Sequence, residues 1–266
     1  WWMVKSGLKD DLFAPGSHPR VSQYRLTAHL GTAFLCYTAM LWNGLSIFRD
    51  HKNWLEPARG RQVLQRLSGP QLSIFRKSVA GLVLLVFTTA LSGGLVAGLD
   101  AGLIYNEFPY MGNGLTPPKS ELFDKFYSRK DDGSDIWWRN MLENPSTVQL
   151  DHRILATTTF AAIMALWAYS RFSPKVRIAL PKSGKKGMLG VVHLVSLQVI
   201  LGISTLIYLV PIPLAAAHQA SSLALLSGVL ILGNRVWVPK RSLTLVQKRL
   251  KQIKQGRSAL PVRPSI

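Results

Sequence analysis

Three histidines of this chain lie inside apolar stretches, where burying a polar side chain costs free energy. His152 follows Asn144 and Pro145, which favour a helix N-cap and a first helical position, so it lies about two turns into a predicted helix. His218 and His29 lie near the starts of two other apolar stretches. A histidine at such a depth in a membrane helix is usually there for function. We therefore take these three residues as the candidate site.

Two imidazoles that face each other inside an apolar helical bundle can serve as the axial ligands of a heme iron. Arg153 follows the first of them and could pair with a propionate. Small residues near His152 and His218 would let a flat cofactor lie against both helices. These small residues are Ala156, Thr157, Ala217, Ser221 and Ser222. Zinc would require three or four close ligands, and the pattern shows only pairs.

Other interpretations of these residues stay open. A lone histidine in a membrane helix often has only a packing role, and we expect this of His193, which lies at the opposite membrane face. A two-heme electron carrier would use the same histidines. A proton-relaying transporter would need further intramembrane acids, and only Asp100 is available. Asp100 and the loop around Glu107 could line the site or have structural roles.

The elements that carry these residues are predicted to be membrane-spanning helices. The chain of 266 residues is 48% hydrophobic, and its apolar residues form long blocks almost free of charge. Each block is long enough to cross a bilayer, which takes about 20 residues. The sequence therefore predicts an all-α, polytopic transmembrane protein. The predicted spans cover residues 25–48, 78–104, 145–169, 188–210 and 214–238.

Positive charge alternates between the connections. Residues 49–77 hold seven Lys or Arg and two acids, residues 173–187 hold five basic residues, and the tail from residue 239 holds eight. The stretch 105–144 has more acids than bases. This alternation places the basic connections on one side of the membrane. It accounts for the formal charge of +19 without a nucleic-acid partner, and the single Cys36 excludes an intrachain disulfide.

A weak internal repeat relates the surroundings of His29 to those of His218. Both follow an alanine and continue with small residues. The repeat predicts two pseudo-symmetric four-helix bundles, of which one is complete here. Residues 1–48 would end the N-terminal bundle, 49–77 form a basic loop, 78–238 form the C-terminal bundle and 239–266 form a basic tail. Because Trp1 opens a stretch that resembles the end of a helix, we expect an N-terminally truncated fragment.

Several motifs together resemble the mitochondrial heme A synthase family, and the resemblance covers nearly the whole chain. It includes Gly98-Leu99-Asp100 with the residues up to Asn106, and Gln149-Leu150-Asp151-His152-Arg153 after Asn144-Pro145. The other matching segments are residues 1–8, 20–29, 108–112, 202–206 and 213–219.

The resemblance implies eight transmembrane helices and the oxidation of a ring methyl of heme O to the formyl group of heme A, for cytochrome c oxidase assembly. It implies a heme b cofactor held between His152 and His218, and a substrate heme bound by His29. The partner of His29 and a catalytic glutamate would lie upstream of residue 1, so the fragment alone is expected to be inactive. The main alternative is a bis-histidine heme b cytochrome that only transfers electrons.

The resemblance also implies a location and partners. The protein would lie in the mitochondrial inner membrane, with the basic loops and tail in the matrix and the heme-side loops in the intermembrane space. Heme O would be the substrate and a protein such as a ferredoxin the electron donor. Heme O synthase, oxidase assembly factors, membrane lipid and a second copy of the chain are further expected partners.

Overall fold

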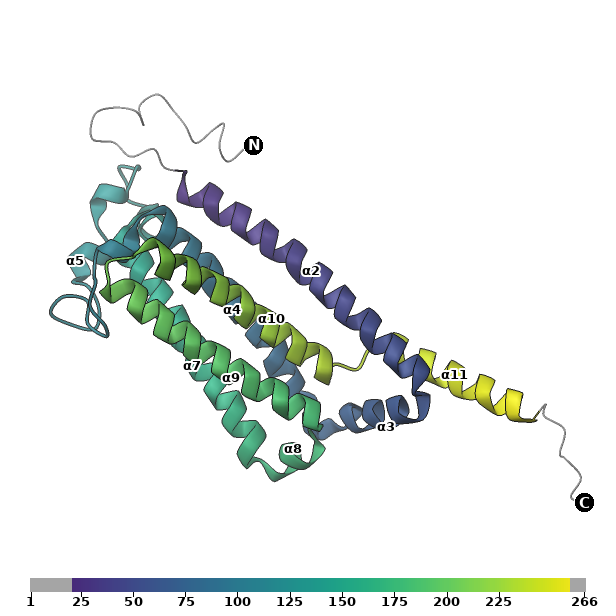
Figure 1. The fold of residues 1–266 in the computed structure, drawn as a ribbon. Helices are drawn as coiled ribbons and strands as arrows, with labels where there is room; N and C mark the ends of the chain where they lie inside the picture. The colour runs from purple at the N-terminus through teal and green to yellow at the C-terminus, as the bar shows by residue number, and fades with distance from the viewer. Residues whose placement is uncertain (1–20, 259–266) are drawn as a thin grey trace, which may run out of the picture.

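The computed structural model describes residues 21–258, and this part of the chain is almost entirely helical (Figure 1). Its one isolated β-bridge joins Met111 and Gly114. The prediction of an all-α protein is therefore confirmed. The predicted helix end at residues 1–8 and the last residues of the basic tail lie outside the described residues.

Five long helices correspond to the predicted spans: α2 (Gln23–Leu55), α4 (Ser73–Gly98), α7 (Pro145–Phe172), α9 (Lys182–Ile207) and α10 (Ile212–Val236). Within residues 21–258, four of them are long and apolar enough to cross a membrane: α2, α4 with the turn before it, α9 and α10. With 28 residues, α7 is also long enough, at about 42 Å. It carries Asp151, Arg153 and several threonines. Its assignment as a span therefore rests on its length and packing.

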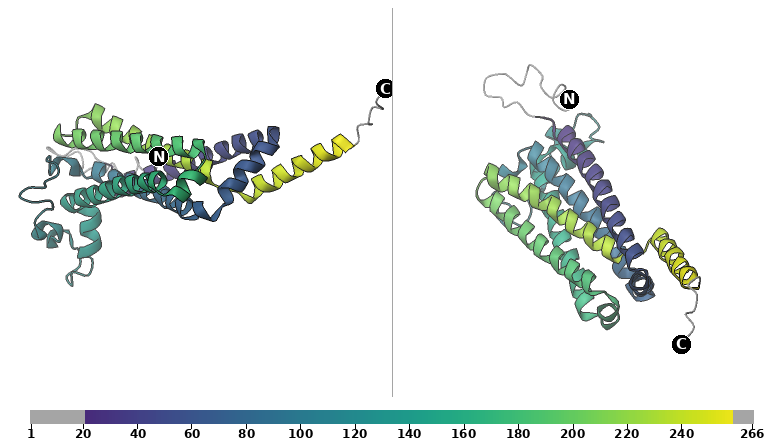
Figure 2. Two further views of the ribbon diagram at one scale, coloured as in Figure 1. Left: turned by 90° about the horizontal axis from the view of Figure 1, so that it is seen from below. Right: turned by 45° about the vertical axis from the view of Figure 1, so that its right-hand side comes forward.

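Four of these helices close a ring. Helix α4 packs against α7 and α10, and α9 packs against the same two helices, so α7 and α10 lie across the ring from each other. Helix α2 packs on the outside of this ring, against α4 and α10 (Figures 1 and 2). The core includes Phe75, Ile163 and Leu226, all fully buried. The ring lies within residues 78–238 apart from the first turns of α4, and the second bundle stays a prediction.

Glycines of α4 let α2 approach closely. A Cβ atom at Gly98 would lie 2.5 Å from the Cα of Gln23, and one at Gly94 would lie 3.0 Å from Oγ1 of Thr27. The contact continues along α2, where Tyr37 shares a 2.7 Å hydrogen bond with a serine of α10. These glycines therefore allow close helix packing.

The basic segments are more helical than the sequence suggested. The predicted connection over residues 49–77 is largely helical: α2 continues to Leu55, and α3 (Pro57–Ser68) follows at once. Buried Leu64 and Leu67 give α3 an apolar face. In the tail, α11 (Lys240–Ser258) packs against α3 and α2. Together with α8 (Pro174–Ala179), these helices lie at the end of the molecule opposite α5 (Lys119–Leu122) (Figure 1).

The acidic connection 105–144 forms a small folded layer at the other end. It contains α5, η4 (Lys125–Tyr127) and α6 (Ile136–Glu143). Asp135 is only 2% exposed; it accepts hydrogen bonds from Ser128 at 2.6 Å and from Arg139 at 2.5 Å. These bonds hold the pKa of the Asp135 carboxyl well below its usual range. Arg139 also pairs with Glu143 at 2.7 Å, which ties the start of α6 to its end.

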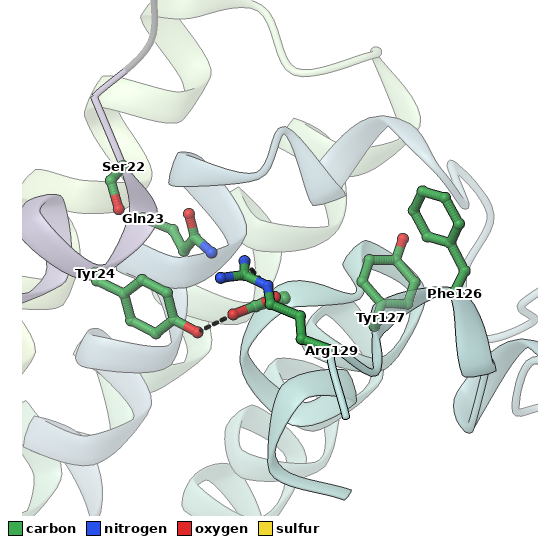
Figure 3. Close-up of a pocket in the computed structure, with 7 residues that line it drawn as sticks. Ser22, Gln23, Tyr24, Phe126, Tyr127 and Arg129 are labelled. Carbon is green, nitrogen blue, oxygen red and sulfur yellow. Dashed lines mark hydrogen bonds and ion pairs between the residues drawn. The ribbon is translucent and has the colours of Figure 1, made fainter. Parts of the chain in front are cut away.

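This layer is joined to α2 through the side chains shown in Figure 3. The Tyr24 hydroxyl donates a hydrogen bond to Glu143 at 2.8 Å, and Arg129 pairs with the other oxygen of the same carboxylate at 3.4 Å. Phe126 and Tyr127 line the far side of the pocket that these groups enclose. The start of α2 is thereby fixed over the folded layer.

We predict that Gly98→Ala separates α2 from α4. The added methyl group has no room against the Gln23 backbone, so the helices must move apart at a cost of about 1–3 kcal/mol. Gly81→Ala is the matched control, since nothing lies within 4 Å of its added Cβ. Thermal unfolding of both purified variants, followed by circular dichroism, measures the difference. Equal melting temperatures would contradict the proposed packing contact.

We predict that Asp135→Asn lowers thermal stability at pH 7, and that the difference from the unaltered protein shrinks below about pH 4. The native carboxyl has a lowered pKa, so it stabilises the fold above the unfolded-state pKa of about 3.9. This stability is lost as the pH falls towards the native pKa. Melting temperatures between pH 7 and pH 3 test this prediction. A difference that stays constant over the range would exclude it.

Candidate functional site

His152 of α7 lies against two small residues of α4. Its Nδ1 atom is 2.7 Å from Oγ of Ser92. A Cβ atom at Gly93 would come within 3.3 Å of its Cε1 atom, so the imidazole occupies the space that a side chain would fill. The predicted N-terminus of α7 is confirmed, because the Asn144 side chain accepts a hydrogen bond from the Ser146 amide and Pro145 is the first helical residue.

His218 of α10 has a similar position against α9. A Cβ atom at Gly202 would come within 2.9 Å of its Cε1 atom. Its Nε2 atom lies 3.5 Å from the Gln198 amide nitrogen. Its Nδ1 atom is buried and has no hydrogen-bond partner within the described residues. Both histidines therefore lie edge-on against a glycine of the neighbouring helix.

The structure brings His152 and His218 into the same ring of helices, on the two helices that lie across from each other. Around them, the side-chain oxygens of Ser221, Gln198 and Gln149 are buried without a partner among the described residues. Buried polar atoms normally have a partner, so these atoms indicate a group that binds between the helices.

The donor set fits a heme better than a bare metal ion. Residues 21–258 contain no group of three or more His, Cys, Asp or Glu side chains that could hold a metal ion. Two imidazoles are sufficient for heme iron, whose other four ligands come from the porphyrin. The glycines beside both rings and the unpartnered polar atoms suit a large, flat group with polar edges.

Arg153 fastens a loop over the outer end of the ring. Its guanidinium donates hydrogen bonds to the carbonyl oxygens of Tyr105 at 3.0 Å, Glu107 at 2.9 Å and Tyr110 at 3.0 Å. On the other side, Asn106 donates to the carbonyl of Leu206 near the end of α9, at 3.0 Å. The loop therefore bridges α7 and α9. The sequence suggested that Arg153 binds a propionate, whereas in the structure it holds this loop.

The predicted small residues divide into two groups. Ser221 is buried one turn from His218, and Ala156 is half-buried. Ser222 is half-buried as well, whereas Thr157 and Ala217 are exposed. The residues of α4 and α9 that lie against the imidazoles, Ser92, Gly93 and Gly202, were not predicted from the sequence. A signal was present in the run Ser92-Gly93-Gly94, three small residues inside an apolar helix.

His29 lies at a similar level but outside the ring. Thr27 and Leu30 of α2 lie against Gly94 of α4. The adjacent residue Gly93 lies against His152 of α7. His29 itself is exposed and points away from that contact. The described residues therefore do not bring it to the other two histidines. Of the other candidates, Glu107 contributes its backbone to the Arg153 loop, while Asp100 is exposed with a left-handed φ of 47° after α4.

The sequence of this chain is similar to one known protein family and to several of its members. Residues 1–230 match the family model COX15-CtaA, described as cytochrome oxidase assembly protein. A heme A synthase–mitochondrial ferredoxin fusion protein of Schizosaccharomyces pombe is 50% identical over 89% of this chain and 38% of its own length. Heme A synthase COX15 of Saccharomyces cerevisiae is 45% identical over 90% of this chain and 49% of its own length. Heme A synthase COX15 of Homo sapiens is 46% identical over 90% of this chain and 52% of its own length.

The chain thus spans about half the length of the curated relatives that it matches. No solved structure matches it significantly.

We predict that Gly202→Ala weakens the binding of added hemin to the purified full-length protein by about 5- to 150-fold. The added Cβ would lie 2.9 Å from the His218 ring, so the ring must shift, and overpacking of this kind costs about 1–3 kcal/mol. Gly190→Ala on the same helix is the control, because nothing lies within 4 Å of its added Cβ. Hemin titration followed by the Soret band measures both affinities. Equal hemin affinities of the two variants would show that Gly202 does not lie at the binding site.

Proposed function

This chain belongs to the COX15-CtaA family, and we propose that the whole protein is a heme A synthase, which oxidises a methyl group of heme O to the formyl group of heme A. The observation that carries the proposal is the pair His152 and His218, placed across one ring of helices beside buried, unpartnered polar atoms. Identities of 45–50% to proteins named heme A synthase support the assignment.

We assign a heme b cofactor to this ring, which His152 and His218 would hold through their imidazole nitrogens. When bound, the heme supplies one-electron chemistry that no side chain of the chain offers. Gly93 and Gly202 leave room for the two imidazoles beside it. The loop held by Arg153 closes the outer end of the ring and limits the entry of water.

His29 is the residue that we assign to the substrate heme. It is exposed on the side of α2 that faces away from α4, so a heme bound there would be separated from the ring by α2 and α4.

The proposed setting is the mitochondrial inner membrane, with α3, α8 and α11 on the matrix side and the layer of α5 and α6 in the intermembrane space. The end-to-end separation of the basic and acidic connections supports this orientation (Figure 1). A ferredoxin is the proposed electron donor, supported by the Schizosaccharomyces pombe relative named as a fusion with mitochondrial ferredoxin. Heme O synthase, oxidase assembly factors and a second copy of the chain are further proposed partners.

The test is reversed-phase analysis of the hemes in membranes that contain the full-length protein and a source of heme O. We expect heme A to appear, and to be lost in His29→Ala and in His218→Ala. His193→Ala is the matched control, because this histidine of α9 is exposed on the outside of the ring. If His193→Ala also lost heme A, the losses in His29→Ala and His218→Ala would no longer identify these residues as heme ligands.

The same experiment separates the synthase from a bis-histidine heme b cytochrome. An electron carrier would show a low-spin heme b spectrum that requires His152 and His218, while heme O would remain unconverted. This result would retain the assignment of the two axial ligands and reject the synthase activity.

A further inference from the structure

We propose that Ser92 is a positioning residue that holds His152 in the tautomer with the proton on Nδ1, and so leaves on Nε2 the lone pair that a heme iron would bind. The inference rests on the proposed function in its consequence for heme, although the tautomer itself can be measured without heme. It starts from two short contacts made by one hydroxyl group.

The first contact fixes the hydroxyl proton. Ser92 Oγ lies 2.7 Å from the carbonyl oxygen of Thr89 on the preceding turn of α4. A carbonyl oxygen carries no proton, so this distance is favourable only if the serine is the donor. A hydroxyl group has one proton, and in Ser92 this proton is directed to the Thr89 carbonyl oxygen.

The second contact then has only one favourable arrangement. The same Ser92 Oγ lies 2.7 Å from Nδ1 of His152. Since the hydroxyl proton already points to Thr89, Ser92 must accept this bond, and Nδ1 must carry the proton. A neutral imidazole has one N–H group, so Nε2 is left with its lone pair. Metal-bound histidines commonly have such an arrangement, with the second nitrogen donating to a fixed acceptor.

A neighbouring bond fixes the two helices at this place. Thr159 lies two turns after His152 on α7, and its Oγ1 is 2.8 Å from Oγ1 of Thr89. Thr89 Oγ1 also donates to the carbonyl of Leu85 at 2.8 Å, so by the same reasoning it accepts from Thr159. Thr89, whose carbonyl accepts the hydrogen bond from Ser92, is thus itself bonded to α7. Rotation of α7 against α4 would break both bonds, which restricts where the His152 ring can lie.

The two histidines differ in this respect. Nδ1 of His218 is buried without a hydrogen-bond partner among the described residues, whereas Nδ1 of His152 has Ser92. A hydrogen bond from Nδ1 increases the electron density of the imidazole and its strength as a ligand. It therefore stabilises ferric over ferrous heme, and we expect Ser92 to lower the reduction potential of the bound heme.

The first test is ¹⁵N NMR of the full-length protein purified without heme and labelled at histidine, with the His152 signals assigned by their loss in His152→Gln. We expect Nδ1 to show the shift of a protonated nitrogen and Nε2 that of an unprotonated one. In Ser92→Ala this preference should be lost, and Ser92→Thr, which keeps the hydroxyl, should restore it. A protonated Nε2 in the unaltered protein would overturn the proposal.

The second test is a redox titration of the heme-loaded protein. Ser92→Ala should raise the midpoint potential, and Ser92→Thr should return it towards the original value. Ser196→Ala is the matched control, because its Oγ donates to the Val192 carbonyl at 2.9 Å in the same way but touches neither histidine. An unchanged potential in heme-loaded Ser92→Ala would overturn the inference.

The two tests fail in distinguishable ways. If Ser92→Ala is purified without heme, the NMR result decides, since it requires none. If the unaltered protein binds no heme at all, the proposed function fails, and the tautomer measurement still decides the role of Ser92.

Discussion

Two imidazoles inside a ring of apolar helices impose the constraint on which the rest of this structure depends. An imidazole that leaves water needs partners for both ring nitrogens, and the interior of a membrane protein offers few. Here α4 supplies a hydroxyl group to one ring, and a glycine stands beside each ring to leave it room. Among the described residues, Nδ1 of His218 and the side-chain oxygens of Gln198 and Ser221 are buried near this pair without a partner. The ring of helices is therefore arranged for a group that binds inside it.

The elements outside the ring serve to hold this arrangement. Arg153 follows His152 directly and fastens the outer loop by three backbone carbonyls, so the histidine and the cover of its site are positioned by adjacent residues. At the start of α2, the Tyr24 hydroxyl bonds to a carboxylate of the folded layer. Helix α2 then crosses α4 at Gly94 and Gly98. The packing thereby connects the folded layer, α2 and the site.

The sequence predicted the features that depend on local patterns. Long apolar blocks indicated the helices, and Asn144 with Pro145 located the start of α7, because N-caps are determined by a few adjacent residues. The histidine pair was predicted for the same reason, from its depth in each helix. Features that depend on how helices rotate against each other were not predicted. Ser92 and Gly202 touch the imidazoles only because α4 and α9 turn these faces inward, which no local pattern specifies. Likewise α3 was taken for a loop, because its arginines obscured the apolar face formed by Leu64 and Leu67.

The two histidine locations differ in how accessible they are to a ligand from outside. His152 and His218 are half-buried on two helices of one ring, whereas His29 is exposed on α2. A pair inside one ring favours a permanently bound cofactor, since exchange would require the helices to part. An exposed ligand favours a group that arrives and leaves. This difference agrees with a cofactor heme in the ring and a substrate heme beside α2.

The central claim is that His152 and His218 together bind one heme in the ring. The most direct measurement is low-temperature electron paramagnetic resonance of the oxidised full-length protein, compared with His152→Ala and His218→Ala. The account predicts a low-spin ferric signal typical of two imidazole ligands, which either substitution converts to a high-spin signal or removes. A bis-imidazole signal that persists in both variants would contradict it.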